Sequence, residues 1–286
     1  MPKYYTRVCN FSFGKSSINK IRNKKALPLN GNKLLSFESI ELITKTKKKI
    51  ISLDKINNLK NDIKRKIKKD LKIIIKKKKF NNLNLDNFPV LMGVLNLTPD
   101  SFSDGGLYNN KLDGYNQAKY LFSKGCDILD IGGESTRPGS KEIKKEIEWE
   151  RIEGVLKKIK KLNKFISIDT RKSNIMKKSL MYKINLINDV SGLSHDPNTI
   201  NLLKKTKSPF VIHHMKGTTE NMQKKPKYNN VVLEIYDFFE RKIKQLRKNG
   251  IKHNNIILDP GIGFGKDLKH NITILNNISI FHSLGF

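Results

Sequence analysis

The stretch Pro89-Val-Leu-Met-Gly-Val-Leu95 is a short apolar run, and it leads directly into the glycine-punctuated segment Asn96-Leu-Thr-Pro-Asp-Ser-Phe-Ser-Asp-Gly-Gly106. A second pair has the same design, because Cys126-Asp-Ile-Leu-Asp-Ile131 precedes Gly132-Gly-Glu-Ser-Thr-Arg-Pro-Gly-Ser140. Both apolar runs have the length and composition of strands in a parallel sheet that is buried on both faces. Polar loops after such strands meet at the carboxyl end of a barrel, where barrel enzymes place their functional groups. The two segments therefore predict a barrel whose site lies in these loops.

The alternation of apolar runs and helical patterns continues to the end of the chain. Strands are predicted at 90–95, 126–131, 165–169, 184–187, 209–213 and 255–259. Helices are predicted near 113–124, 145–161, 173–181, 197–206 and 229–249, and another begins near Asn271. Glycines at helix ends, such as Gly125 and Gly250, are typical of a repeating βα unit. The predicted fold class is α/β, a TIM (β/α)8-type barrel that is incomplete here, with about six βα units.

Further motifs in this region carry a resemblance to a known family. After the two loops come Ser167-Ile-Asp-Thr170, Ile187-Asn-Asp-Val-Ser-Gly192, His213-His-Met-Lys-Gly217 and Leu258-Asp-Pro-Gly-Ile-Gly-Phe-Gly-Lys266. In this order the motifs resemble dihydropteroate synthase, the pterin-binding enzyme of folate biosynthesis, from about Pro89 onward. The resemblance implies a transferase that condenses 4-aminobenzoate with 6-hydroxymethyl-7,8-dihydropterin diphosphate, giving 7,8-dihydropteroate and diphosphate.

The resemblance assigns the pterin pocket to polar residues at three strand ends. Asp169, Asn188 and Asp259 match the pterin positions of the family, and Asp169 is also assigned a catalytic role in stabilising developing positive charge. A buried carboxylate suits a pterin because it accepts two donors of the ring edge at once. Met215 and Phe264 resemble the apolar walls of the pocket. Taken alone, the polar residues would be read as helix caps and the apolar ones as core.

The two loops supply the residues expected to bind diphosphate, metal and aminobenzoate. Asn96 matches the family residue that contacts Mg²⁺, the expected cofactor, through a side-chain oxygen. Thr136 offers a hydroxyl, and Arg137, a second catalytic candidate, offers a permanent cation to the diphosphate. Phe102 and Pro138 resemble the wall for the aminobenzoate ring. His213 and His214 are interpreted as structural, because adjacent strand residues face opposite ways.

The composition favours a cytoplasmic protein, and the resemblance implies small-molecule partners, the dihydropterin diphosphate and 4-aminobenzoate. There are 57 Lys and Arg against 26 Asp and Glu, which gives a net charge of +31. Such a charge alone would suggest binding to polyanions, but Lys dominates and the Arg and aromatic pattern of nucleic-acid recognition is sparse. Cys9 and Cys126 lie far apart, so neither a disulfide framework nor a zinc site is indicated. We expect that the protein binds neither a specific nucleic acid nor a membrane. A homodimer is compatible with this sequence.

The sequence composition of the chain changes near residue 88. Residues 1–88 are predicted to form a lysine-rich extension or small subdomain, and residues 89–286 the pterin-binding barrel, truncated before its seventh strand. The segment Lys60–Lys79 predicts a basic surface helix, with Ile63, Ile67 and Leu71 on one face. A solvated or partly disordered extension is the simplest interpretation of the first region, and a transit peptide is a weaker one.

Three other interpretations remain open at this point. A methyltetrahydrofolate:corrinoid methyltransferase-type barrel would share the pterin edge, but it has no need for the Ser-Thr-Arg-Pro-Gly loop. A catalytically inactive truncated remnant is the second, since the family's Ser-Arg-Lys and Arg-x-His motifs are absent from this sequence. A polyanion-binding module built around the lysine-rich first region is the third.

Overall fold

The structure is a computed structural model that describes residues 2–80, 89–98 and 111–286. The chain forms two compact units. The barrel unit comprises Asn81–Tyr228 and Arg241–Asn271. The N-terminal unit comprises Met1–Phe80 together with two later segments, Asn229–Glu240 and Ile272–Phe286. Each unit is described by itself.

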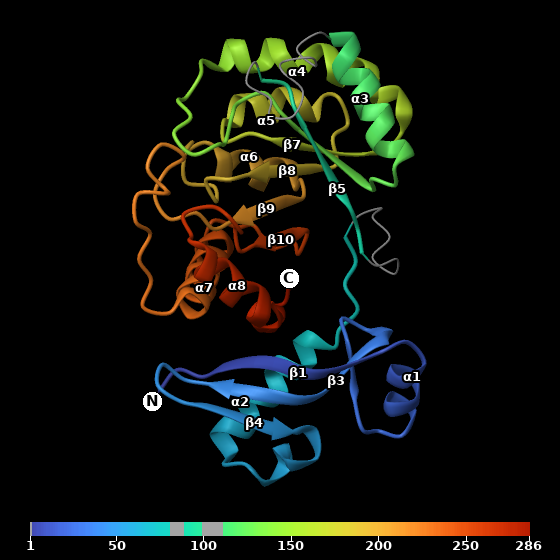
Figure 1. Cartoon of the computed structure of the whole chain (residues 1–286), viewed down its shortest axis with the longest axis vertical. Helices are drawn as coiled ribbons and strands as arrows, with labels where there is room; N and C mark the ends of the chain where they lie inside the picture. Colours follow the sequence, from blue (N-terminus) through green and yellow to red (C-terminus); the bar gives the residue numbers. More distant parts are fainter. Residues whose placement is uncertain (1, 81–88, 99–110) are drawn as a thin grey trace. The chain divides into compact units, whose positions relative to one another are not determined.

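A parallel sheet forms the centre of the barrel unit (Figure 1). Within the described residues it has six strands, and each pairs in parallel with the next along the chain. The strands are β5 (Met92–Asn96), β6 (Ile128–Gly132), β7 (Phe165–Asp169), β8 (Leu186–Asp189), β9 (Phe210–His213) and β10 (Ile256–Asp259). All five residues of β6 and all four of β9 are buried, which explains their nearly continuous apolar sequences.

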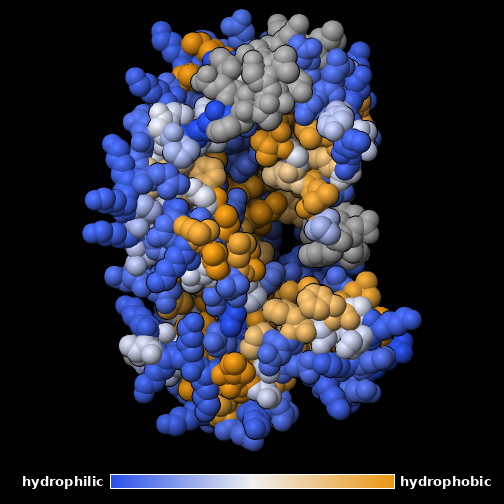
Figure 2. Space-filling model, viewed as in Figure 1, coloured by the Kyte–Doolittle hydropathy of each residue, from blue (hydrophilic) through white to orange (hydrophobic). Residues whose placement is uncertain are grey.

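Helices follow the strands, and the first four of them pack beside one another in chain order. They are α3 (Lys111–Ser123), α4 (Lys145–Ile159), α5 (Ser173–Leu180), α6 (Thr199–Thr206), α7 (Val231–Lys248) and α8 (Leu268–Asn277), with the short 3-10 helix η2 (Lys160–Leu162) after α4. Neighbours α3 and α4, α4 and α5, and α5 and α6 are in contact. In Figure 2, hydrophilic residues cover much of the left side of this unit and apolar residues gather near its centre.

The predicted elements of the barrel unit agree with the structure. All six strands lie within two or three residues of their predicted bounds, and helices occur at each predicted place. The α/β fold with a barrel-type parallel sheet is therefore confirmed. Phe102 and the rest of 99–110 lie outside the described residues.

The N-terminal unit is built on an antiparallel sheet. The long strands β1 (Tyr5–Phe13) and β3 (Asn32–Ile43) pair along most of their length, and β2 (Leu27–Leu29) and β4 (Lys48–Ser52) pair with β3. The helix α1 (Gly14–Arg22), the 3-10 helix η1 (Leu53–Asn58) and the basic helix α2 (Asn61–Ile74) complete the N-terminal part. Ile67 and Leu71 of α2 are buried in the core, as their spacing predicts.

Segments from the end of the chain complete this unit. The 3-10 helix η3 (Ile278–Leu284) contacts β1 and α2. Ser279 donates a hydrogen bond of 2.8 Å to the carbonyl oxygen of Val8, and the rings of Tyr5 and Tyr236 meet edge to face with centroids 5.1 Å apart. Residues 2–80 thus contain an ordered antiparallel sheet with its own hydrophobic core. Among the described residues, no helix combines the length and apolarity that crossing a membrane requires.

Candidate functional site

Four residues at the carboxyl ends of adjacent strands form one row across the barrel sheet. Asn96 of β5 pairs with Gly132 of β6, Gly132 with Asp169 of β7, and Asp169 with Asn188 of β8. Residues paired in register across a parallel sheet point to the same face. The register therefore brings together three of the polar residues that the sequence predicted, Asn96, Asp169 and Asn188.

Gly132 creates space inside this row. A Cβ atom at Gly132 would lie 3.5 Å from Oδ1 of Asn96 and 3.5 Å from Oδ2 of Asp169. The two oxygens thus border the volume that the missing side chain leaves open. Two side-chain oxygens around an open volume match the hard ligands that Mg²⁺ prefers. In the described part of the chain, no group of three His, Cys, Asp or Glu has the arrangement of a metal site.

Asp130 belongs to the same site, although the sequence analysis did not select it. It lies within β6 and is 4% exposed, and its Oδ2 accepts a hydrogen bond of 2.8 Å from the side-chain amide of Asn188. This contact fixes the Asn188 amide so that its nitrogen faces Asp130 and its oxygen is left for another donor. An acidic residue inside an apolar strand was the available signal, since burial of such a group requires a partner.

Three buried oxygens of this cluster have no hydrogen-bond donor among the described residues. They are Oδ1 of Asp130, Oδ1 of Asp169 and Oδ1 of Asn188. A buried acceptor without a donor costs free energy, and native proteins leave few of them. Three such acceptors on three adjacent strands indicate a site prepared for a ligand that carries several N–H groups.

The electrostatics of the cluster point to the same conclusion. Burial raises the pKa of Asp169 well above the ordinary aspartate value, and the neighbouring carboxylates, Asp130 first among them, raise it further. Burial also raises the pKa of Asp130, and the charge of Asp259 adds to this effect. Carboxyl groups whose pKa values are raised by burial and by neighbouring carboxylates cluster at functional sites. A ligand with N–H donors would favour their ionised forms.

Asp259 lies at the end of β10 with its carboxylate 43% exposed. Its Oδ1 accepts a hydrogen bond of 2.7 Å from the backbone N–H of Gly261, and its Oδ2 lies 3.7 Å from Nδ1 of His213. The Phe264 ring packs edge to face on the His213 ring, with centroids 4.6 Å apart. Burial lowers the pKa of His213, so its imidazole is neutral near pH 7. His213 thus supports Asp259 and Phe264, in agreement with a structural role.

A buried lysine closes the loop between Asp259 and α8. Nζ of Lys266 donates to the carbonyl oxygens of Gly261 and Phe264, both at 2.8 Å, and to that of His214 at 3.2 Å. Burial lowers the pKa of Lys266 to about 8, while the charge of Asp259 opposes this shift. Burial, helped by the charge of Lys266, lowers the pKa of His214 to about 3. Lys266 therefore holds the backbone that carries Phe264 beside the strand ends.

The remaining predicted residues lie in the loops around these strand ends. Thr136 and Arg137 are half-buried and Pro138 is exposed in the loop after β6. The N–H of Gly139 in this loop donates a hydrogen bond of 2.9 Å to the carbonyl oxygen of Thr219, in the loop after β9. Met215, just after β9, is half-buried. Thr136, Arg137 and Pro138 thus lie in the loop after β6, and Met215 lies in the loop after β9.

Comparisons with known proteins find similar sequences and similar structures. The family model described as pterin binding enzyme matches residues 92–286. A dihydropteroate synthase of Escherichia coli (strain K12) is 39% identical over 195 residues, which are 68% of this chain and 69% of the relative. The Yersinia pestis dihydropteroate synthase, solved with a sulfonamide drug complex, has a TM-score of 0.67 and 38% identity, covering 72% of this chain and 75% of that one. The Xanthomonas albilineans enzyme, solved with 4-aminobenzoic acid, has a TM-score of 0.63 and 34% identity, covering 69% and 70%.

Proposed function

This chain belongs to the dihydropteroate synthases, a family of pterin-binding enzymes, and we propose that its strand-end oxygens bind the dihydropterin ring. As a member of this family it is a transferase of folate biosynthesis, which condenses 4-aminobenzoate with 6-hydroxymethyl-7,8-dihydropterin diphosphate. What the structure contributes beyond the family is the arrangement of this chain's own residues, from which the roles below are inferred.

The observation that carries the proposal is the set of three unpartnered acceptors, Oδ1 of Asp130, Asp169 and Asn188. A pterin presents N–H and amino donors along one flat edge, so it can satisfy several such acceptors at once. Asp259, whose Oδ2 is not used by the Gly261 turn, would take a further donor from the ring. A ring that lacked these donors would leave buried acceptors unpaired and would therefore bind poorly.

The diphosphate is proposed to lie between Asn96 and the loop after β6. Thr136 and Arg137 would donate to phosphate oxygens, because a hydroxyl and a guanidinium fork both suit them. The oxygens of Asn96 and Asp169 beside Gly132 fit Mg²⁺, and Asn96 is the residue proposed to hold it. When bound, the ion neutralises charge on the leaving diphosphate. Asp169 would face the carbon that becomes positive as the diphosphate leaves, and its carboxylate would stabilise that charge.

The aminobenzoate ring is proposed to pack against Pro138, with Met215 and Phe264 as walls toward the pterin. Phe102, the other predicted wall, lies outside the described residues.

We further propose a cytoplasmic enzyme whose partners are small molecules rather than membranes or specific nucleic acids. Sedimentation would test for a homodimer. Support for the cytoplasm comes from the two free cysteines, Cys9 and Cys126.

Asp259→Asn tests the pterin pocket. The amide oxygen can still accept the Gly261 N–H, so the turn is kept, but one acceptor for the ring becomes a donor. We expect the affinity for dihydropterin diphosphate to fall by at least about tenfold, which corresponds to about 1.4 kcal/mol. Calorimetry with Mg²⁺ present would measure it, with the exposed Asp267→Asn as the matched control. Equal affinities of Asp259→Asn and the wild type would remove Asp259 from the pocket.

Arg137→Lys tests the diphosphate site. An ammonium keeps the charge but cannot reproduce the planar pair of donors, so we expect pyrophosphate to inhibit or bind about five- to tenfold more weakly. The same exchange at the exposed Arg241 of α7 controls for the change of side-chain type. A pyrophosphate dissociation constant that is unchanged in Arg137→Lys would show that the guanidinium does not contact the phosphates.

A further inference from the structure

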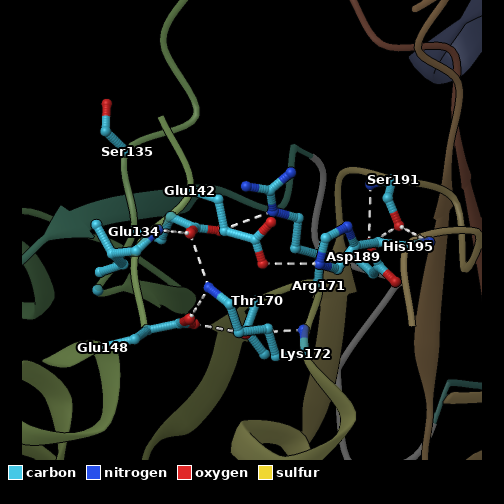
Figure 3. A network of polar contacts seen from close by, with 12 residues as sticks. Glu134, Ser135, Glu142, Glu148, Thr170, Arg171, Lys172, Asp189, Ser191 and His195 are labelled. Carbon is cyan, nitrogen blue, oxygen red and sulfur yellow. Dashed lines mark hydrogen bonds and ion pairs between the residues drawn. The ribbon is translucent and has the colours of Figure 1, made fainter. Parts of the chain in front are cut away.

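A buried carboxylate stands at the base of the loop after β6. Glu134 is 6% exposed, and both of its oxygens accept hydrogen bonds (Figure 3). Its Oε2 accepts from Nε of Arg171 at 2.7 Å, while its Oε1 accepts from Nζ of Lys172 at 2.7 Å and from the backbone N–H of Ile143 at 2.9 Å. Glu134 and Ile143 lie near the two ends of the loop between β6 and α4. The Glu134 side chain therefore links the two ends of this loop.

Lys172 is the centre of the network around Glu134. Its Nζ also donates at 2.7 Å to Oε2 of Glu148, which is fully buried on α4. The hydroxyl of Thr170 donates to the other oxygen of Glu148 at 2.5 Å. Two carboxylates, Glu134 and Glu148, thus face two cations, Arg171 and Lys172, so the buried charges balance. Burial tends to raise the pKa of Glu134, but Arg171 and Lys172 outweigh it and lower that pKa.

The backbone below the loop is fixed as well. The guanidinium of Arg151 donates a hydrogen bond of 2.8 Å to the carbonyl oxygen of Gly133. A Cβ at Gly133 would lie only 2.8 Å from the backbone oxygen of Glu148, so α4 and the start of the loop are in close contact. Removing one member of a buried charge cluster leaves another charge without compensation, which is costly. The network is therefore stiff only while all of its members are present.

This network joins two functional segments. The loop that it closes carries Thr136, Arg137 and Pro138, and residues 170–172 follow Asp169 directly at the end of β7. We propose that Lys172 is a positioning residue for the reaction. By pairing Glu134 with Glu148, it sets the place of the loop relative to the strand-end carboxylates. Nζ of Lys172 forms ion pairs with Glu134 and Glu148, so its effect on the reaction would be indirect. The expected effect of Lys172 on catalysis rests on the proposed function of the loop. The expected effect of Lys172 on the closure of the loop does not depend on that function.

The first experiment measures the closure directly by hydrogen exchange of the whole chain. Lys172→Met keeps the length of the side chain and removes the ammonium. We expect the peptide containing 135–143 to exchange at least about tenfold faster, because the Ile143 N–H loses the fixed acceptor Glu134. Lys177→Met, an exposed lysine on α5, is the matched control and should leave this peptide unchanged. Unchanged exchange in Lys172→Met overturns the inference whatever the function of the protein.

The second experiment separates positioning from stability. In Lys172→Met the KM for aminobenzoate and the inhibition constant of pyrophosphate should rise at least about fivefold, while the affinity for 6-hydroxymethyl-7,8-dihydropterin, which lacks the diphosphate, stays within about twofold. A purely structural lysine would lower the melting temperature and leave these constants equal to those of the wild type. If Lys172→Met does not fold, Glu134→Gln keeps an acceptor for Ile143 and must still weaken pyrophosphate binding, and failure to do so overturns the inference. Absence of pterin binding in the wild type would count against the proposed function alone.

Discussion

Asp169→Asn is expected to lower turnover by at least about 100-fold and, at the same time, to stabilise the fold. The loss follows because an amide cannot balance the positive charge that develops as the diphosphate leaves. The gain in stability follows because the buried Asp169 lies among other carboxylates. Burial and the charge of Asp130 both raise its pKa. Steady-state kinetics and thermal unfolding on the same samples would measure the two effects. Unchanged turnover would remove Asp169 from the reaction.

The pH dependence of the stability gain has a definite direction. The pKa of Asp169 is raised in the folded protein. Folding therefore takes up a proton at pH values between the ordinary aspartate pKa of 3.8 and the raised pKa of the folded state. Stability from this group is therefore complete at acid pH and is lost as the pH rises through the raised value. The melting temperature of Asp169→Asn should exceed that of the wild type by a margin that widens toward neutral pH. Asp62→Asn, on the exposed first turn of α2, should show no such widening. A constant margin for Asp169→Asn would contradict the buried charge.

The barrel unit could be predicted in detail because its signals are local. Each strand is an apolar run bounded by polar or glycine residues, and each helix between strands has its own pattern. The N-terminal sheet could not be predicted in this way, since β1 pairs with β3 across a helix and its packing partners include η3, far along the chain. Its strand sequences, such as Tyr5–Phe13, mix apolar and polar residues that fit several structures.

The candidate site divides along the same line. Asn96, Asp169 and Asn188 were selected because their motifs resemble those of the family, and the register of parallel strands places them in one row. Lys172 and Lys266 were missed because a lysine in a chain with 57 Lys and Arg carries no local sign of burial. Their roles depend on acceptors from distant segments, such as Glu134 and the carbonyl oxygen of His214. The burial of a charged side chain depends on tertiary contacts, and local sequence periodicity does not predict it.

The loop of Asp259 provides a strong test of backbone geometry, because two of its glycines share a positive φ but differ in the space around them. Gly261 and Gly263 both have positive φ, +68° and +82°. A Cβ at Gly263 would meet no atom within 4 Å, so Gly263→Ala should cost only about 1–2 kcal/mol for the left-handed backbone. A Cβ at Gly261 would overlap the carbonyl oxygen of His214 and lie 2.6 Å from Nε2 of His213.

Gly261→Ala is therefore expected to lower the free energy of unfolding by about 2–5 kcal/mol, the left-handed cost plus that of overpacking. The displaced backbone would also pull the Gly261 N–H from Asp259 and the Gly261 carbonyl from Lys266, which are now 2.7 and 2.8 Å contacts. Pterin affinity should fall in Gly261→Ala and persist in Gly263→Ala. Denaturant unfolding and calorimetry on both variants would measure the difference. Equal losses in the two would mean that close packing of this loop against β9 does not hold Asp259 in place, and that its position is set by β10 alone.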